Sequence, residues 1–183
     1  MVDPMKMTHA AVTSGRLWRR GVWSAALLLW LVPLIAMRVT TQVQWTAFDF
    51  AVFGAMLIAG AGAFDLVTRL SGSLVFRAAA GVALLGAFLL VWINLAVGML
   101  GSEDNPANLI YALALAVGGI GAVLVRFQAR GLAGVMLAVA GVQAAVAIAS
   151  YVLGYEALVL NGSFVAIWLL SAWLFHMAAK GSA

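Results

Sequence analysis

Apolar runs long enough to cross a bilayer alternate with short polar connections along the whole chain. The runs cover about residues 21–37, 47–68, 77–98, 106–125, 131–153 and 164–178. A helix that crosses the hydrocarbon core needs about 20 mostly apolar residues. The pattern therefore predicts an all-α membrane protein, with six transmembrane helices in a single polytopic domain that spans residues 1–183.

The composition supports this prediction and excludes several classes of protein. Of the 183 residues, 66% are hydrophobic and only 9% are charged, which is too little charge to cover a water-soluble domain. The absence of cysteine excludes disulfides, iron–sulfur clusters and thiolate zinc sites. The net charge is +4, but the basic residues are spread between apolar runs, so we expect the lipid bilayer and not nucleic acid as the partner.

The basic residues predict the orientation of the chain in the membrane. If the N-terminus is cytoplasmic, nine of the ten Lys and Arg residues lie on the cytoplasmic side, and only Arg38 lies outside. Cytoplasmic connections of membrane proteins carry such an excess of Lys and Arg. We therefore expect both termini to be cytoplasmic, in a multi-pass protein of a bacterial inner membrane.

The first apolar run has two explanations. Arg19 and Arg20 precede it with Trp18 and Trp23 interleaved, as at a cytoplasmic membrane interface. A cleaved secretory signal also begins with a basic region and continues with an apolar run, but residues 36–38 give no small-x-small cleavage site. We favour a retained first helix.

The two central hairpins, residues 47–98 and 106–153, resemble each other. In each hairpin, an aromatic residue, a glycine and two arginines follow in the same order. These are Phe53, Gly60, Arg69 and Arg77 in the first hairpin, and Tyr111, Gly118, Arg126 and Arg130 in the second. The pattern indicates a parallel duplication, unlike the inverted repeats of many transporters. The alternative is that any two glycine-rich hairpins with basic cytoplasmic turns look alike.

Glycines within the apolar runs predict close helix packing. Small residues allow helix backbones to approach closely, which is a main source of packing energy in lipid. A glycine-rich phosphate loop would instead follow a strand and carry a lysine, and this sequence has neither feature around residues 118–121. The glycines expected at helix contacts are Gly60, Gly62, Gly118, Gly119, Gly121, Gly134 and Gly141.

The segment GSEDNPAN, residues 101–108, joins the third and fourth predicted helices; we call it the acidic corner. Asn105 or Asp104 can cap the N-terminus of the following helix, and Pro106 suits its first position. Capping explains only some of these polar residues. The corner is therefore also the best candidate for binding a partner or a small ligand.

Further polar residues fall at a similar depth in the neighbouring helices. They could line a small polar pocket open to the periplasm, which could hold a cation or a polar ligand, or they could form hydrogen bonds that only hold the helices together. For Gln143, in the fifth helix, we expect a hydrogen bond to another helix. The candidate binding residues are Asn94, Glu103, Asp104, Asn105, Asn108, Tyr111 and Asp49.

The chain offers no constellation for catalysis. Its two histidines are His9 in the N-terminal tail and His176 near the C-terminus, so no pair of buried axial ligands for haem is expected. No serine, histidine and acid fall at a common depth. We expect a protein that is not an enzyme and has no metal or cofactor.

The central residues also carry a resemblance to a family. The run from Trp92 to Gly98, WINLAVG, followed by the acidic corner and Arg126-Phe127, resembles the core of a family of small bacterial inner-membrane proteins without an assigned activity. The resemblance covers about the middle half of the chain. It implies a bacterial inner-membrane setting and no particular chemistry.

Two functions are consistent with these features. The first is a non-catalytic scaffold or accessory component whose periplasmic acidic corner binds a partner or a small ligand. Small-residue helix faces favour association with another membrane protein or with a second copy of the chain. The alternative is a small ion or solute transporter or channel, with Asn94, Tyr111 and Asp104 at its mouth.

Overall fold

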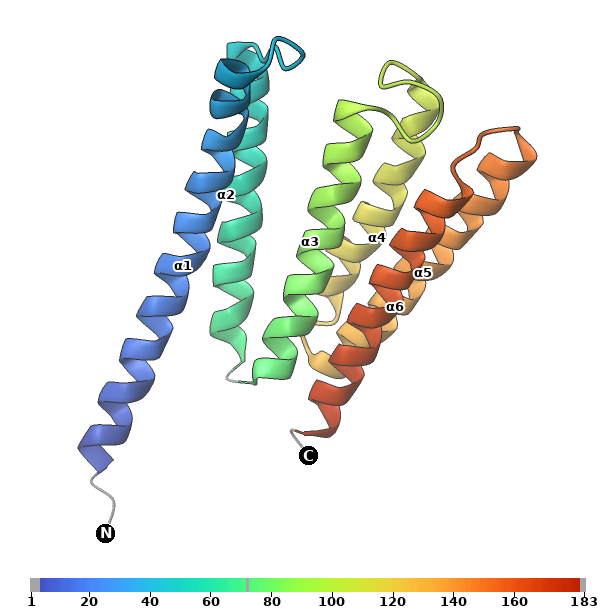
Figure 1. Cartoon of the computed structure of the whole chain (residues 1–183). Helices are drawn as coiled ribbons and strands as arrows, with labels where there is room; N and C mark the ends of the chain where they lie inside the picture. Colours follow the sequence, from blue (N-terminus) through green and yellow to red (C-terminus); the bar gives the residue numbers. More distant parts are fainter. Residues whose placement is uncertain (1–3, 72, 182–183) are drawn as a thin grey trace. The chain divides into compact units, whose positions relative to one another are not determined.

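The computed structural model describes residues 4–71 and 73–181. Over these residues it contains helices and no strand, and six of the helices are long and apolar enough to cross a membrane (Figure 1). The elements are α1 (Pro4–Val39), α2 (Ala47–Leu70), α3 (Leu74–Ala96), the 3-10 helix η1 (Pro106–Ile110), α4 (Tyr111–Leu124), α5 (Ala129–Val152) and α6 (Leu158–Lys180). The prediction of an all-α protein with six helices of membrane-spanning length is confirmed.

The structure adds detail to three of the predicted spans. Helix α1 begins at Pro4, before its apolar span, and that span, Arg20–Val39, lies close to the predicted residues 21–37. The fourth span opens with the 3-10 turn η1 before α4 begins. Helix α6 begins at Leu158 and not near residue 164, so Asn161 and Gly162 lie inside a helix, although an Asn-Gly pair favours a turn. The Asn161 amide donates to the carbonyl of Ala157 four residues earlier, a bond that is compatible with the helix.

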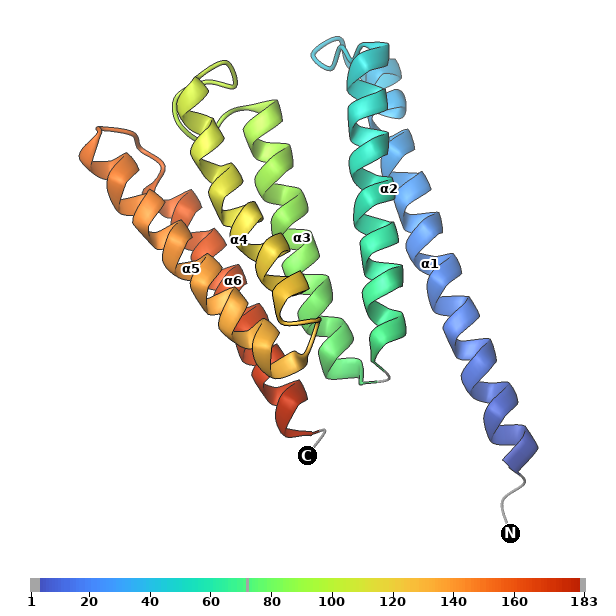
Figure 2. The ribbon, with the colours of Figure 1, turned by 180° about the vertical axis from the view of Figure 1, so that it is seen from behind.

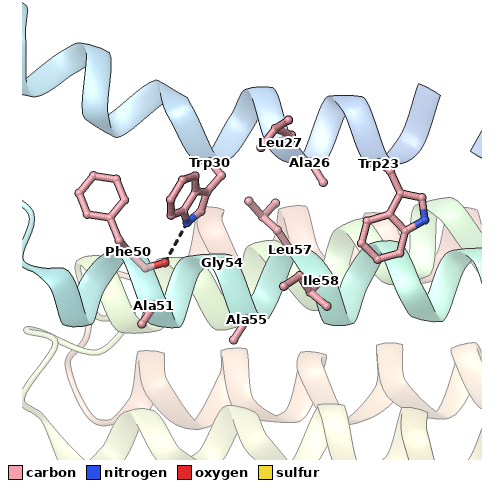
Figure 3. A pocket seen from close by; sticks show the side chains of 10 residues that line it. All are labelled: Trp23, Ala26, Leu27, Trp30, Phe50, Ala51, Gly54, Ala55, Leu57 and Ile58. Carbon is pink, nitrogen blue, oxygen red and sulfur yellow. Dashed lines mark hydrogen bonds between the residues drawn. The ribbon is translucent and has the colours of Figure 1, made fainter. Parts of the chain in front are cut away.

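The chain forms two compact units, Met1–Asp65 and Leu66–Ala183. In the first unit, the indole Nε1 of Trp30 on α1 donates to the carbonyl oxygen of Phe50 on α2 at 3.0 Å. Gly54 makes room for this indole, because a Cβ at that position would lie 2.9 Å from Trp30 Nε1. The two helices are therefore joined by a tryptophan that spans the gap between them (Figure 3).

An apolar groove of about 450 Å³ lies between α1 and α2 (Figure 3). Trp23, Leu27 and Trp30 line it from α1, and Phe50 and Leu57 are among the residues that line it from α2. A polar solute would lose its hydrogen bonds to water in such a groove. The groove therefore suits hydrocarbon.

The second unit is a bundle in which α6 packs against both α3 and α5, and α4 packs against α5 (Figures 1 and 2). Small residues set these contacts. A Cβ at Gly86 would lie 2.8 Å from Ile167 and 3.0 Å from Trp168, so α3 approaches α6 as closely as a glycine permits. Gly121 has the same role against Val135, at 2.8 Å. Close backbone approach of this kind is expected where lipid is the solvent.

The two ends of this bundle differ in charge. The connections α3–α4 and α5–α6 lie at one end, and the α4–α5 turn and the last residues of α6 lie at the other (Figures 1 and 2). We call them the acidic end and the arginine end. The acidic end carries Glu103, Asp104 and Glu156, and the arginine end carries Arg77, Arg126, Arg130 and Lys180.

The α4–α5 turn at the arginine end has an unusual backbone. Arg126 and Phe127 have φ angles of 52° and 57°, in the left-handed region that residues with a Cβ rarely adopt. The amide of Phe127 donates to the carbonyl of Ala122, and the amide of Gln128 donates to that of Val125. These bonds close the end of α4 and reverse the chain within a few residues.

Candidate functional site

Asn108 holds the backbone of the acidic corner in place. Its Oδ1 accepts hydrogen bonds from the amides of Met99 and Leu100 at 3.0 and 2.9 Å, and its Nδ2 donates to the carbonyl of Ser102 at 2.7 Å. Met99 and Leu100 are buried, so their amides need partners inside the protein. All the polar atoms of the Asn108 side chain are therefore used within the corner.

Asn105 has a similar structural role. Its Oδ1 accepts from the amide of Ala107 at 3.0 Å and so caps η1, as the sequence predicted for the start of the fourth span. Its Nδ2 donates to the carbonyl of Leu100 at 2.7 Å and to the hydroxyl of Tyr155 at 3.1 Å. Because Tyr155 lies in the α5–α6 connection, this amide ties the two connections of the acidic end together.

Glu103 and Asp104 lie on the surface of the corner. Both side chains are exposed, and neither carboxylate forms a hydrogen bond or an ion pair with residues 4–71 or 73–181. Two glycines with positive φ, Gly98 at 74° and Gly101 at 86°, allow the chain to turn before them. The corner thus displays two carboxylates on a backbone that two asparagines hold in place.

Tyr111 does not join the corner; it points into the bundle. It is 2% exposed, and its hydroxyl lies near Asn161 without a hydrogen-bond partner among the described residues. Asn161 and Gln143 are both 0% exposed, and Gln143 Nε2 donates to Asn161 Oδ1 at 2.8 Å. The predicted hydrogen bond between Gln143 and another helix is confirmed. Tyr111, Gln143 and Asn161 form what we call the buried polar cluster.

Asn94 is also turned toward its own helix. Its Nδ2 donates to the carbonyl of Leu90 at 2.7 Å, whereas its Oδ1 is buried without a partner among the described residues. Gln143 Oε1 is a second such oxygen. Buried oxygens without partners are uncommon in proteins and call for an explanation.

Asp49 lies in the first unit and makes local bonds. Its Oδ2 accepts from the amide of Thr46 at 2.7 Å and from the Thr46 hydroxyl at 2.8 Å, and Thr46 Oγ1 accepts from the amide of Asp49 at 3.3 Å. This reciprocal arrangement is a capping box at the start of α2, with an acid in the third helical position. The geometry assigns Asp49 a capping role.

The structure therefore divides the predicted site. Asn105 and Asn108 support the corner, Glu103 and Asp104 are displayed on it, and Tyr111 belongs to the buried polar cluster. The sequence did not point to Asn161, because the sixth apolar run was expected to begin after it, near residue 164. A polar residue in the middle of an apolar run, four positions after Ala157, was the signal that could have found it.

Comparison of the chain with protein-family models, with curated protein sequences and with solved structures gives no match.

Proposed function

We propose that this chain is a non-catalytic component of the bacterial inner membrane, a scaffold or accessory subunit, whose acidic corner binds a basic segment of a partner in the periplasm. The observation that carries the proposal is the exposed pair Glu103 and Asp104 on a corner that is held by amide hydrogen bonds. A fixed backbone reduces the entropy that is lost on binding. Two adjacent unpaired carboxylates favour a partner with Lys or Arg at the contact.

The proposal is tested with the full chain in nanodiscs. The double variant Glu103→Gln, Asp104→Asn removes both charges and preserves the size of the side chains. We expect the variant to lose a co-purifying partner that the unchanged chain retains at low salt. The retention should also decrease as salt is raised, because exposed charges are screened over about 8–10 Å at physiological ionic strength.

Glu156→Gln is the matched control, since Glu156 is an exposed carboxylate at the same end of the bundle. It should leave the partner bound. Equal retention of the partner by the double variant and by the unchanged chain would contradict the proposed role of the corner.

A second function, a small ion or solute transporter, is favoured by the buried side-chain oxygens of Asn94, Tyr111 and Gln143, which have no hydrogen-bond partner among residues 4–71 and 73–181. Polar groups inside a membrane bundle often mark the path of a solute. Liposomes that contain the purified chain would distinguish the two functions. A transporter would move a solute at a rate that Asn94→Leu or Asp104→Asn changes, whereas a scaffold would move none.

A further inference from the structure

A cleft of about 330 Å³ opens at the arginine end of the second unit. Ser71 and Ser73 of the α2–α3 turn form part of its wall, and Arg126, Phe127 and Gln128 of the α4–α5 turn form another part. Its size falls within the range of pockets that bind small ligands. Its lining combines polar groups with the apolar side chains of Phe76 and Ala178.

The cleft is positively charged. The guanidinium group of Arg126 lines it and forms no hydrogen bond or ion pair with any residue in the described part of the chain. Arg77 Nε donates to the carbonyl of Ser71 at 3.2 Å, which holds a second guanidinium group beside the wall. The three acids of this unit, Glu103, Asp104 and Glu156, are at the acidic end. Among residues 66–71 and 73–181 of this unit, no carboxylate side chain therefore lies at the arginine end.

The ends of two long helices add to this charge. Helices α3 and α5 both begin at the cleft, and helix N-termini carry a partial positive charge. Ser73 caps α3, because its hydroxyl oxygen accepts a hydrogen bond from the amide of Phe76, whereas Gln128 gives α5 no side-chain cap. The start of α5 therefore keeps amide groups that can still bind an anion.

The position of the cleft identifies the source of the anion. The apolar spans end at Leu70 and Leu124 and begin again at Leu74 and Ala129, so the cleft lies where helices leave the hydrocarbon region. The phosphate groups of lipids lie at this depth. The apolar part of the lining would contact the first carbons of the lipid chains. A free phosphate has no apolar group that could make this contact.

We propose that this cleft binds the phosphate headgroup of an anionic membrane lipid, with Arg126 as the principal contact and Arg77 as the second positive charge. The site belongs to a different end of the bundle from the acidic corner. It therefore stands independently of the function proposed above.

The experiment measures lipid adducts on the full chain in a nonionic detergent by native mass spectrometry. Phosphatidylglycerol and phosphatidylcholine are titrated separately, and we expect clear preference for phosphatidylglycerol. The principal variant is Arg126→Asn, because asparagine adopts the left-handed conformation readily and so preserves the turn while it removes the charge. Loss of one charge-assisted contact should weaken the binding of phosphatidylglycerol about tenfold or more.

Arg130→Gln is the matched control, since Arg130 is an exposed arginine of the same end that does not line the cleft. It should leave the preference for phosphatidylglycerol within about twofold. The thermal midpoint of each variant without added lipid shows whether the bundle is intact. An intact Arg126→Asn protein that binds phosphatidylglycerol as the unchanged chain does would overturn the proposal.

Two further outcomes would also overturn it. Equal loss of binding in Arg126→Asn and Arg130→Gln would show that the whole charged surface attracts lipid, without a defined cleft. Displacement of phosphatidylglycerol by inorganic phosphate in large excess would assign the cleft to a soluble phosphate ligand and not to a lipid.

Discussion

Replacement of Asn108 by alanine tests whether the acidic corner is held by side-chain hydrogen bonds. Asn108 makes three of them: its Oδ1 accepts from the amides of Met99 and Leu100, and its Nδ2 donates to the carbonyl of Ser102. Asn108→Ala removes all three at once. The amides of Met99 and Leu100 would then have to open to water or remain unpaired.

The expected magnitude follows from the number of bonds. A typical intramolecular hydrogen bond contributes a net 0.5–1.5 kcal/mol, so three bonds contribute about 1.5–4.5 kcal/mol in total. Water can replace some of these hydrogen bonds at the surface of the corner, so we expect a loss of stability in the lower half of this range. Met99 is 5% exposed and Leu100 is 3% exposed, so water would reach their amides only when the corner opens locally.

The assay is amide hydrogen exchange on the full chain in nanodiscs, followed at residues 97–105. We expect exchange at Met99 and Leu100 to become at least about tenfold faster, since each 1.4 kcal/mol is a factor of ten in the opening equilibrium. Exchange in the middle of α5 should not change.

Asn108→Asp provides the control within the same position. A carboxylate can still accept from both amides but cannot donate to Ser102. It should therefore preserve most of the protection that alanine removes. Unchanged protection in Asn108→Ala would refute the conclusion that this side chain fixes the corner.

Three other predictions concern packing and buried polar groups. Gly86→Ala should destabilise the bundle by about 1–3 kcal/mol through overpacking against α6, whereas Gly141→Ala, with open space around it, should not lower the thermal midpoint in detergent. Gln143→Leu and Asn161→Leu should each be destabilising, and a double-mutant cycle with unfolding free energies should give a coupling of about 0.6–1.7 kcal/mol; no coupling would contradict the observed bond. Gly98→Ala should sharply reduce the yield of monodisperse protein in size-exclusion chromatography, because φ is 74° and the new Cβ would collide with the backbone of Ser102; a normal yield would contradict the backbone described.

The spans were predictable because length and hydropathy determine them almost alone. Their boundaries were less so, since polar residues such as Asn161 continue a helix when the side chain bonds to a carbonyl four residues earlier. The start of α1 at Pro4 was missed for a related reason: a polar segment can be helical beyond the membrane, and hydropathy does not report it.

The sequence also predicted only in part which glycines lie at contacts between helices. Gly118 and Gly121 contact α5 as predicted. A Cβ would meet nothing within 4 Å at the other five glycines that were expected at contacts, which are Gly60, Gly62, Gly119, Gly134 and Gly141. The closest contact between α3 and α6 is instead made possible by Gly86, which the pattern did not distinguish. Sequence indicates that a helix has small residues, whereas the face that meets a neighbour depends on the assembled bundle.

The candidate site was divided for a comparable reason. Asn108 and Tyr111 are three residues apart, a spacing that favours a shared face in any helical segment. Asn108 nevertheless bonds back to the amides of Met99 and Leu100, whereas Tyr111 is buried near Asn161. Spacing along one helix does not report these partners, because they lie in the preceding connection and in another helix.

The reversed backbone at Arg126 and Phe127 has a consequence for the evolution of this protein. A residue with a Cβ in the left-handed conformation costs about 1 kcal/mol or more, so asparagine and glycine at these two positions would give a more robust chain. The same change would also remove the Arg126 guanidinium group and the Phe127 ring from the lining of the cleft. Selection for heat resistance alone would thus favour asparagine or glycine in this turn, whereas selection for lipid binding would keep Arg126 and Phe127. Directed evolution under each of the two selections would test this difference.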